Sequence, residues 1–317
     1  MDKFGQSSID YYKIFPDKNL FFPEDGLSFL SYKMSENVAI VLGDPVGPQE
    51  KMEQTISAFL QFCQEKHWCL AFHQTLSDYI SIYKKLGFEV VKIGEDAIID
   101  LSKFCDSTIK NNHFRHIKRK FEHEGYVCRL YIPPHTDSLL DNLEEVSKEW
   151  LTLPGKRERT FTLGYFNHEY LNTTPLYCLE NSDGHILAFM NLIPSYKKGE
   201  TTIDLMRHRI DVPNSCMDNL FLHLFEDKYE EGYKTFNMGM APLAGVSEEP
   251  GSSHKEQAMH FLYEHLQMIF SYKGLKSYKD KFEPAWENRF FVFKEGPLHL
   301  TRIILAFAQI TEKLPKL

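Results

Sequence analysis

Cysteine is scarce in this sequence, and its few copies are not arranged in pairs. The 317 residues include six cysteines, and no two of them form a C-x-x-C motif. This usage is typical of reduced thiols and argues against a disulfide framework or a zinc site. Long apolar runs are missing too, since no stretch approaches the roughly 20 apolar residues that span a bilayer. The N-terminus carries charges and a proline where a signal peptide would need an apolar run. We therefore expect a globular cytoplasmic protein.

Several catalytic and nucleotide-binding motifs are also absent. The sequence has no P-loop and no G-x-G-x-x-G, which argues against nucleotide binding by those routes. It lacks G-x-S-x-G and H-E-x-x-H, and its 14 histidines do not fall into metal-ligand spacing. We therefore expect no metal site.

Positive charge does not dominate the composition. Lys and Arg number 36 against 44 Asp and Glu, which gives a formal net charge of −8. This balance excludes a basic coat for nucleic acid, but it leaves room for a local basic patch. With 43% hydrophobic and 14% aromatic residues, the chain can bury a sizeable core. At roughly 150 residues per domain, its length suggests two domains or one large one.

Two α/β units follow one another along the chain. Apolar periodicity predicts mixed strands and amphipathic helices in each unit. Between the units, KNNHFRHIKRKFEHE (110–124) predicts a basic helix. We therefore divide the chain into an N-terminal domain (1–108), a basic connecting helix (109–125) and a C-terminal domain (126–317). Strands are predicted at 27–32, 38–42, 69–73, 88–93 paired with 97–101, 127–132, 176–180, 185–193, 201–206, 235–238 and 289–293. Helices are predicted at 49–66, 76–86, 137–151, 217–230, 254–270 and 298–314.

The densest group of polar residues is TTIDLMRHR (201–209). In a regular strand Asp204 and Arg207 would lie on opposite faces, because side chains alternate with a period of two. A β-bulge or a strand end at this point would bring the carboxylate and the guanidinium into one cleft. A structural ion pair at a sheet edge is the alternative.

A second group, FNMGMAPLAGV (236–246), ends an apolar strand at Gly239. The backbone must turn tightly there, and strand ends of this kind often line clefts in α/β folds. A plain turn explains the same residues equally well.

A third group, SYKGLKSYKDKFEPAWENRFF (271–291), mixes lysines with aromatic rings. Cations interleaved with rings suit a phosphate backbone with stacked bases. A solvated helix end with aromatic packing is the favoured alternative, and the basic helix at 110–124 has the same ambiguity. The amphipathic C-terminal helix has enough apolar character to lie on a bilayer, although packing against the domain is favoured.

The order of the motifs, more than any one of them, resembles a known family. The sequence resembles the C-terminal synthase domain of the phosphatidylglycerol aminoacyltransferases, the multiple peptide resistance factor or lysylphosphatidylglycerol synthetase family. The similarity covers about residues 20 to 295. It rests on GDPVG (43–47), YKKLGFEVVKIGEDAIIDL (83–101), FRHIKRKFEHEGY (114–126), Trp150, ERTFTLGYF (158–166), DLMRH (204–208), MDNL (217–220), FNMGMAPL (236–243) and GLKSYKDKFEPAW (274–286).

The resemblance implies an α/β fold made of tandem GNAT-like acyltransferase domains joined by a basic helix. It also implies transfer of an aminoacyl group, of lysine or alanine type, from aminoacyl-tRNA to a lipid hydroxyl such as that of phosphatidylglycerol. Neither a metal nor coenzyme A is required, so we expect no cofactor. An aminoacyl ester is already activated, so such an enzyme must mainly hold the donor, orient the acceptor and stabilise the developing oxyanion.

The resemblance also assigns candidate residues. The catalytic candidates are Asp204, Arg207 and Lys281. Asp204 and Glu158 would bind the ammonium of the donor, and Arg207 and Lys281 would hold a ribose-phosphate or the acceptor's phosphate. Asp204 acting as general base is the weaker alternative, because no neighbour visible in the sequence argues for a raised pKa. The substrate-binding candidates are Glu158, Phe161, Gly239, Met240 and Ala241, and the tRNA-binding candidates are Arg115, Lys118, Arg119, Lys120, Lys276 and Lys279.

Two further readings of the sequence stay open. Family members with lipid activity usually carry a polytopic membrane region ahead of this domain, and these 317 residues contain none. The acceptor is therefore open between a lipid, a peptide and another hydroxyl or amine compound, and a lipid acceptor implies peripheral binding at the inner membrane face. The rival functions are an acyl-CoA N-acyltransferase, whose R/Q-x-x-G-x-G/A turn is absent here, and a non-catalytic tRNA or lipid-surface module.

Overall fold

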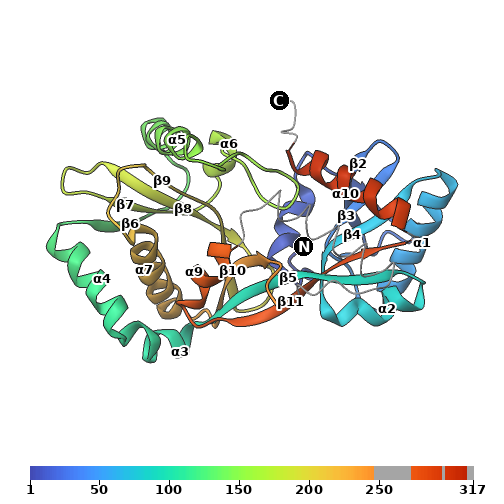
Figure 1. Cartoon of the computed structure of the whole chain (residues 1–317), viewed down its shortest axis with the longest axis horizontal. Coiled ribbons are helices and arrows are strands. Elements are labelled where there is room, and N and C mark those ends of the chain that lie inside the picture. Colours follow the sequence, from blue (N-terminus) through green and yellow to red (C-terminus); the bar gives the residue numbers. More distant parts are fainter. Residues whose placement is uncertain (246–272, 295–296, 313–317) are drawn as a thin grey trace.

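The computed structural model describes residues 1–245, 273–294 and 297–312 (Figure 1). The predicted helix at 254–270 lies outside the described residues. The strands are β1 (Asn19–Phe21), β2 (Leu30–Ser35), β3 (Val38–Leu42), β4 (Cys69–Thr75), β5 (Glu89–Asp100), β6 (Val127–Tyr131), β7 (Leu176–Glu180), β8 (Ile186–Pro194), β9 (Glu200–His208), β10 (Thr235–Pro242) and β11 (Ala285–Phe293). The helices are α1 (Met52–Glu65), α2 (Ile80–Lys85), α3 (Leu101–Asp106), α4 (Asn112–His123), α5 (Asp137–Leu151), α6 (His168–Leu171), α7 (Cys216–Glu230), α9 (Lys273–Asp280) and α10 (Pro297–Glu312). The 3-10 helices are η1 (Ser8–Ile14), η2 (Gln49–Lys51), η3 (Ser77–Tyr79) and η4 (Thr108–Lys110).

The described strands form one twisted sheet in the order β1-β2-β3-β4-β11-β5-β10-β9-β8-β7-β6. Within it, β3 pairs with β4 and β9 pairs with β10 in parallel, and the other described pairs are antiparallel. Strand β11 comes late in the chain, yet it lies between β4 and β5. The predicted domain boundaries stay a prediction, and the sheet itself runs continuously through both halves.

Helices cover both faces of this sheet. In Figure 1, α5, α6 and α10 lie above it, while α2, α3 and α7 lie below. Strand β3 shows why: Val38, Ile40 and Leu42 pack into the cluster that includes α10, and Ala39 and Val41 pack with α1. Since the strand is apolar on both faces, it must be covered on both. The expected packing of the C-terminal helix against the domain is confirmed by its contacts with β2, β3 and β4.

One predicted hairpin is wrong. The runs at 88–93 and 97–101 are a single strand, β5, which pairs with β11 on one side and β10 on the other. Gly94, between the two runs, lets β5 and β10 approach closely. A Cβ at this position would lie 2.6 Å from the carbonyl oxygen of Ala241 in β10.

The predicted basic helix at 110–124 forms as α4 (Asn112–His123). Its role as a connection between two domains stays a prediction. Asn111 caps it by accepting a hydrogen bond from the backbone N–H of Phe114 at 2.8 Å. Its buried face carries Phe114, Ile117 and Phe121, which pack into a cluster with α3 and α7. The exposed residues Arg115 and Arg119 lie away from this buried face.

Candidate functional site

A β-bulge in β9 positions the first candidate residue, Asp204. The sequence allows a bulge or a strand end as the way to bring Asp204 and Arg207 into one cleft, and that shared cleft stays a prediction. Phe189 and Met190 pair with Arg207 and Met206, but Leu192 pairs with Ile203, so β9 has one extra residue opposite Asn191. The buried Asn191 side chain holds the bulge, because its Oδ1 accepts a hydrogen bond from the N–H of Leu205 at 2.8 Å. Asp204 and Leu205 together lie opposite the single residue Asn191.

Strands β9 and β10 separate just before this bulge. Their parallel pairing covers only Glu200–Thr202 and Thr235–Asn237, although both strands continue well beyond. Diverging carboxyl ends of parallel strands are a common place for ligand sites in α/β folds. Asp204 therefore lies where the sheet opens.

The Asp204 carboxylate is held by a set of donors that we call the Asp204 site: Tyr12, Gly164 and Tyr170. The Tyr170 hydroxyl donates to Oδ2 at 2.5 Å, and the Gly164 N–H lies 3.0 and 3.1 Å from the two oxygens. Tyr12 is a further hydrogen-bond partner. Asn191 donates to the Tyr170 oxygen at 3.0 Å and so orients that hydroxyl.

Gly164 must be a glycine for this arrangement. A Cβ at this position would lie 2.1 Å from Oδ2 of Asp204 and 2.8 Å from the Tyr170 ring. The absence of a side chain lets the backbone N–H reach the carboxylate.

Burial and the neighbouring groups shift the pKa of Asp204 in opposite directions. Burial raises the pKa of Asp204, while Tyr170, Gly164, Tyr12 and the more distant Arg207 act to lower it. The sequence offered no argument for a raised pKa here, because the desolvation comes from the fold.

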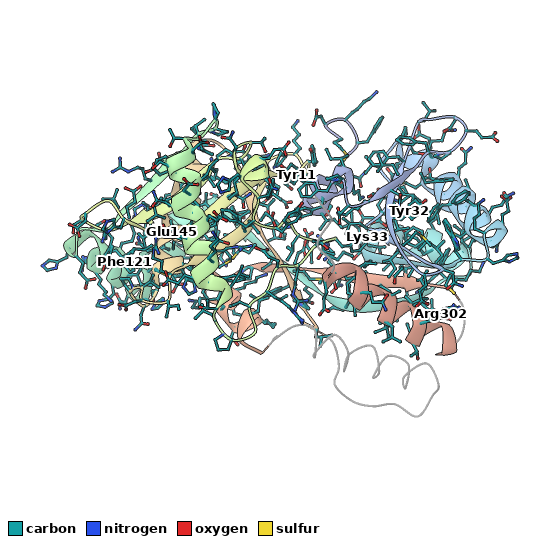
Figure 2. The ribbon with its side chains drawn as sticks, turned by 90° about the horizontal axis from the view of Figure 1, so that it is seen from above. Tyr11, Tyr32, Lys33, Phe121, Glu145 and Arg302 are labelled. Carbon is teal, nitrogen blue, oxygen red and sulfur yellow. The ribbon has the colours of Figure 1, made fainter. Side chains whose placement is uncertain are left out.

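The N-terminal segment lies against Asp204, and sequence reasoning missed it. Helix η1 contacts β2, β3 and β8, and it places Tyr11 and Tyr12 beside Asp204. Seen from above, Tyr11 lies between Glu145 of α5 and Lys33 of β2 (Figure 2). Phe15 also packs edge-on against Tyr170, with ring centroids 5.5 Å apart. The aromatic run at 11–15 was the only available signal.

Arg207 shares the strand with Asp204 but contacts a different carboxylate. Its guanidinium makes two hydrogen bonds of 2.7 Å to Glu158 and one of 2.5 Å to Ser147. It also lies over the Trp150 ring at 5.0 Å and is 2% exposed. The pair therefore fixes the loop that carries Gly164, and direct contact of Arg207 with a substrate stays a prediction.

Lys281 belongs to another group of residues. Its ammonium lies 2.7 Å from both carboxylate oxygens of Asp218 in α7, and 4.1 Å from the centre of the Tyr278 ring. It contacts neither Asp204 nor Arg207 in any described interaction. Its catalytic role stays a prediction.

The candidates in β10 form a bulge of their own. Between Asn237 and Met240 the register against β5 shifts, and Gly239 adopts a positive φ of 79°. The Gly239 N–H is taken by Oδ1 of Asn237 at 2.7 Å. Ala241 is 1% exposed. Substrate binding by Gly239 and Ala241 stays a prediction.

Phe161 and Met240 are brought together by the fold. Both belong to the hydrophobic cluster that also contains Tyr11 and Tyr170, next to the Asp204 site. Phe161 is fully buried and has a positive φ of 75°, an uncommon backbone conformation for an aromatic residue. A role in shaping an amino-acid pocket stays a prediction.

Lys279 lies inside the molecule, although it was grouped with the RNA-binding lysines. Its ammonium donates to the carbonyl oxygens of Gly239 at 2.7 Å and Met240 at 3.1 Å, and the residue is 5% exposed. Burial lowers the pKa of Lys279 to about 8, and Asp96 acts against that shift. The side chain thus supports the β10 bulge and does not lie on a surface that an RNA backbone could reach.

Lys279→Met is expected to change how stability depends on pH. Since burial lowers the pKa of Lys279 from 10.5 to about 8, the unfolded chain binds more protons between these values. The free energy of unfolding of the wild type therefore increases as the pH rises, and that of the variant lacks this increase. Urea unfolding at about pH 8, 9 and 10 should show the variant losing stability relative to the wild type as pH rises.

Lys276→Met is the matched control, because Lys276 lies one turn earlier, 43% exposed and paired with Asp280 at 2.9 Å. It should show no such trend. An equal trend in both variants would contradict the burial of the Lys279 ammonium.

The remaining RNA-binding candidates differ in exposure. Arg115 and Arg119 are exposed on α4, while Lys118 makes an ion pair with Glu226 at 2.7 Å. Lys120 is half-buried and lies 5.9 Å from the Phe121 ring centre. The ammonium of Lys276 lies 4.8 Å over the Trp286 ring.

An open cleft of about 590 Å³ lies near the start of β9. It is lined by residues 5–7, 76–78, 197–198, 200 and 286–289. Its size is within the usual range for small-molecule sites. Its lining includes both basic and acidic side chains, and Lys197 is already paired with Glu200 and Glu287.

One group of side chains has donor atoms close enough for a metal ion. In the described part of the chain, Asp141, Glu144 and His168 place one ligand atom each within 4.8 Å of the others. Glu144 is already paired with Lys148 at 2.9 Å. Acidic surface groups of this kind are common without an ion. Separately, no helix in the described ranges is long and apolar enough to cross a membrane.

The fold is of the α/β class, with helices on both faces of one mixed sheet, as the sequence led us to expect. The chain belongs to the family described as phosphatidylglycerol lysyltransferase, C-terminal, which matches residues 1–293.

Similar proteins agree with this membership. Phosphatidylglycerol lysyltransferase of Bacillus subtilis (strain 168) is 34% identical over 292 residues, covering 92% of this chain and 34% of the relative. That of Staphylococcus epidermidis (strain RP62A) is 34% identical over 310 residues, covering 96% and 37%. The solved structure of L-PGS from Bacillus licheniformis superposes with a TM-score of 0.86 at 32% identity, covering 98% of this chain and 94% of that one. The chain therefore spans about a third of the length of the curated relatives it matches.

Proposed function

We propose that this chain transfers an aminoacyl group, of lysine or alanine type, from aminoacyl-tRNA to the hydroxyl of a phospholipid such as phosphatidylglycerol. The observation that carries the proposal is the Asp204 carboxylate, fixed by three donors where β9 and β10 separate. Family membership supports it, since the relatives are named phosphatidylglycerol lysyltransferases. The tandem division at 1–108, 109–125 and 126–317 is part of the same proposal.

Asp204 acts as the anionic anchor for the donor's ammonium. The hydrogen bonds from Tyr170 and Gly164 hold the carboxylate in position and favour its charged form, against the burial that raises its pKa. In a partly desolvated place, that charge attracts an ammonium more strongly than it would in water. General-base action on the acceptor is the alternative.

The transfer itself needs little covalent chemistry from the protein. The acceptor oxygen attacks the ester carbonyl carbon, and the bond from that carbon to the tRNA ribose oxygen breaks. The acceptor's proton passes to the ribose oxygen, which leaves as a hydroxyl. The protein contributes by holding both reactants in line. Arg207 takes part indirectly, because its pairing with Glu158 fixes the loop that presents Gly164 to Asp204.

The exposed face of α4 is the RNA-binding surface in this proposal. Arg115 and Arg119 lie four residues apart, so both project from one side of the helix. The double variant Arg115→Ala/Arg119→Ala is expected to weaken tRNA binding about tenfold and to reduce the salt dependence by about one unit per lost phosphate contact. Binding isotherms at several salt concentrations measure both effects.

Lys84→Ala/Lys85→Ala is the control, since it removes two exposed lysines from α2. This pair should leave the affinity and its salt slope unchanged. Equal weakening by both double variants would show that RNA contacts are not concentrated on α4.

The acyl-CoA alternative is disfavoured by the start of α7. A helix N-terminus after β9 would be the natural anion site for a pyrophosphate. Here the first turn carries Asp218, whose buried carboxylate is paired with Lys281. A negative charge at this place repels a phosphate group.

The proposal is tested by offering one donor to several acceptors. Lysyl- and alanyl-tRNA carrying labelled amino acids are incubated with vesicles of phosphatidylglycerol, vesicles of phosphatidylethanolamine, or a soluble peptide. We expect label in the phosphatidylglycerol fraction. Label on the peptide would change the acceptor, and transfer from acetyl-CoA in place of tRNA would support the N-acyltransferase. Binding of tRNA without transfer to any acceptor would support the non-catalytic module.

A further inference from the structure

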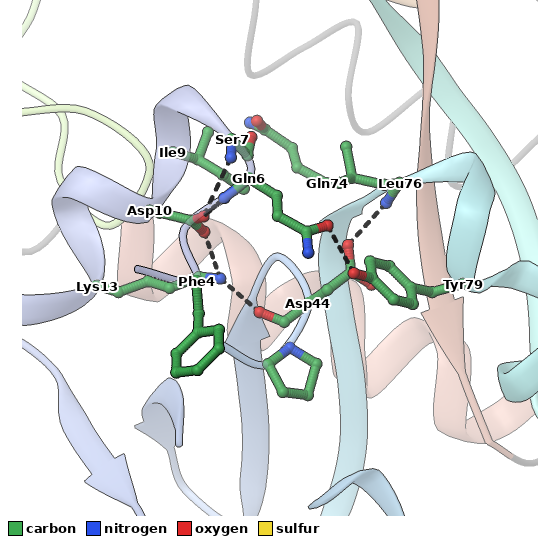
Figure 3. A pocket seen from close by; sticks show the side chains of 11 residues that line it. Phe4, Gln6, Ser7, Ile9, Asp10, Lys13, Asp44, Gln74, Leu76 and Tyr79 are labelled. Atoms are coloured by element: carbon green, nitrogen blue, oxygen red, sulfur yellow. Dashed lines mark hydrogen bonds and ion pairs between the residues drawn. The ribbon is translucent and has the colours of Figure 1, made fainter. Parts of the chain in front are cut away.

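The N-terminal segment that delivers Tyr12 to Asp204 is anchored at a second place. Lys13, the next residue, turns away from Asp204 and is 1% exposed. Its ammonium makes an ion pair with Asp10 at 2.6 Å and donates a hydrogen bond to the backbone carbonyl of Asp44 (Figure 3). A lysine this deeply buried is held by partners of fixed geometry.

Asp44 is itself held rigidly. Its carboxylate accepts the N–H of Leu76 at 2.8 Å and the hydroxyl of Tyr83 at 2.9 Å. Asp44 lies two residues after the end of β3, and Leu76 lies directly after β4, so these contacts join the carboxyl ends of the other parallel strand pair. A small cavity of about 10 Å³, close to the size of one water molecule, remains beside Lys13.

The residues just before Tyr12 and Lys13, from Gln6 to Asp10, are also held by hydrogen bonds. Asp10 Oδ2 accepts the backbone N–H groups of Gln6 and Ser7 at 2.8 and 3.1 Å. Gln6 in turn accepts the Tyr79 hydroxyl at 2.6 Å. Ser8 lies 3.3 Å from the Asn237 amide in β10. The segment thus connects the ends of β3 and β4 to the place where β9 and β10 separate.

We propose that Lys13 is a positioning residue for the Asp204 site, and that it acts through its neighbour Tyr12. This inference rests on the function proposed for that site. Adjacent residues of one 3-10 turn point in different directions, so fixing Lys13 on Asp10 and Asp44 fixes Tyr12 on Asp204. The carboxyl ends of β3 and β4 are occupied by the chain's own ammonium.

The consequence is electrostatic. When the anchor is lost, η1 shifts and Tyr12 no longer donates to Asp204, so the pKa of that carboxyl rises further. The charged or titratable groups that face Asp204 from the surrounding elements are Tyr11 and Tyr12 on η1, Lys18 after it, Tyr170 on α6 and Arg207 on β9. Only the first three belong to the anchored segment.

The test follows Asp204 directly in the full chain. The carboxyl carbon of Asp204 is titrated by NMR in selectively ¹³C-labelled protein, where its signal is the one missing from Asp204→Asn. We expect Lys13→Met to raise its midpoint by about one pH unit, as expected for the loss of one hydrogen bond to a charged group. The acidic limb of the transfer rate should move by the same amount, and kcat/KM should fall about tenfold. Adding Tyr12→Phe to Lys13→Met should change the midpoint no further.

Lys228→Met is the matched control. Lys228 is also a buried lysine with an acidic partner three residues away, Glu231 at 2.7 Å, but it lies on α7. It should lower stability without moving the Asp204 midpoint. Should Lys13→Met fail to fold, Gln6→Ala removes the hydrogen bond from Tyr79 to the same segment and should shift the midpoint in the same direction by less.

The outcomes separate the two proposals. An unchanged midpoint in Lys13→Met and Gln6→Ala, or an equal shift in Lys228→Met, would overturn the positioning role. A shifted midpoint in a protein whose wild type transfers no amino acid would support the positioning role and reject the proposed function.

Discussion

Asp204→Asn is expected to lower kcat/KM for aminoacyl transfer by about a hundredfold or more while leaving the fold intact. The change removes one negative charge and keeps the shape of the side chain. The amide oxygen can still accept hydrogen bonds from Tyr170 and Gly164, which hold the wild-type carboxylate at 2.5 and 3.0 Å. What is lost is the attraction for the donor's ammonium. Steady-state transfer rates with saturating lipid, together with a thermal unfolding scan, measure both parts of this prediction.

The pH dependence provides a second readout of the same variant. Because burial raises the pKa of Asp204, the wild-type rate should fall as the pH drops through that raised value, where the charge is lost. The residual rate of Asp204→Asn should lack this acidic limb.

Asp100→Asn is the control for this prediction, since Asp100 also accepts a backbone N–H, that of Lys103 at 2.9 Å, but lies at the start of α3. It should transfer at the wild-type rate. Full activity in Asp204→Asn would remove Asp204 from the site.

Arg207→Ala is expected to lower the free energy of unfolding by about 3–5 kcal/mol, because it leaves the Glu158 carboxylate without its partner in a largely buried place. The guanidinium is 2% exposed, and its two hydrogen bonds to Glu158 are both 2.7 Å long. The truncation also opens space beside Trp150. Urea unfolding at neutral pH measures the loss.

Arg209→Ala is the matched control on the same strand. Its side chain is 26% exposed and pairs with Glu149 at 3.0 Å, so the expected loss is about 1 kcal/mol or less. In the double variant Arg207→Met/Glu158→Gln, no unpaired charge remains, and part of the lost stability should return. A loss in Arg207→Ala no larger than in Arg209→Ala would contradict the buried pair.

Much of the framework could be predicted from periodicity. The strand Val38–Leu42 and the helix Asp137–Leu151 have the predicted bounds, because each is marked by an uninterrupted apolar pattern and clear turn or capping residues. The sequence left a bulge at Asp204, a strand end and a structural ion pair open, and pattern alone could not choose among them. The partner of Arg207 could not be predicted either, because it is Glu158, which lies 49 residues earlier in the sequence.

The rest of the site depends on contacts between distant segments. Tyr12, Gly164 and Asn191 come from three other parts of the chain and meet around Asp204, and the local sequence pattern contains no information about such long-range contacts. Lys279 shows the same limit. A lysine-rich helix predicts exposed cations, but the register of α9 against β10 places this one ammonium on two backbone carbonyls.

The central claim is tested most directly by following labelled amino acid from charged tRNA into extracted lipid. Wild-type protein and Asp204→Asn are compared on the same phosphatidylglycerol vesicles, with the two proteins matched for fold and concentration. We predict that label appears in the lipid fraction with the wild type and falls by about a hundredfold with the variant. Label that stays on the tRNA with the wild type, or that reaches lipid equally well with both proteins, would contradict this account.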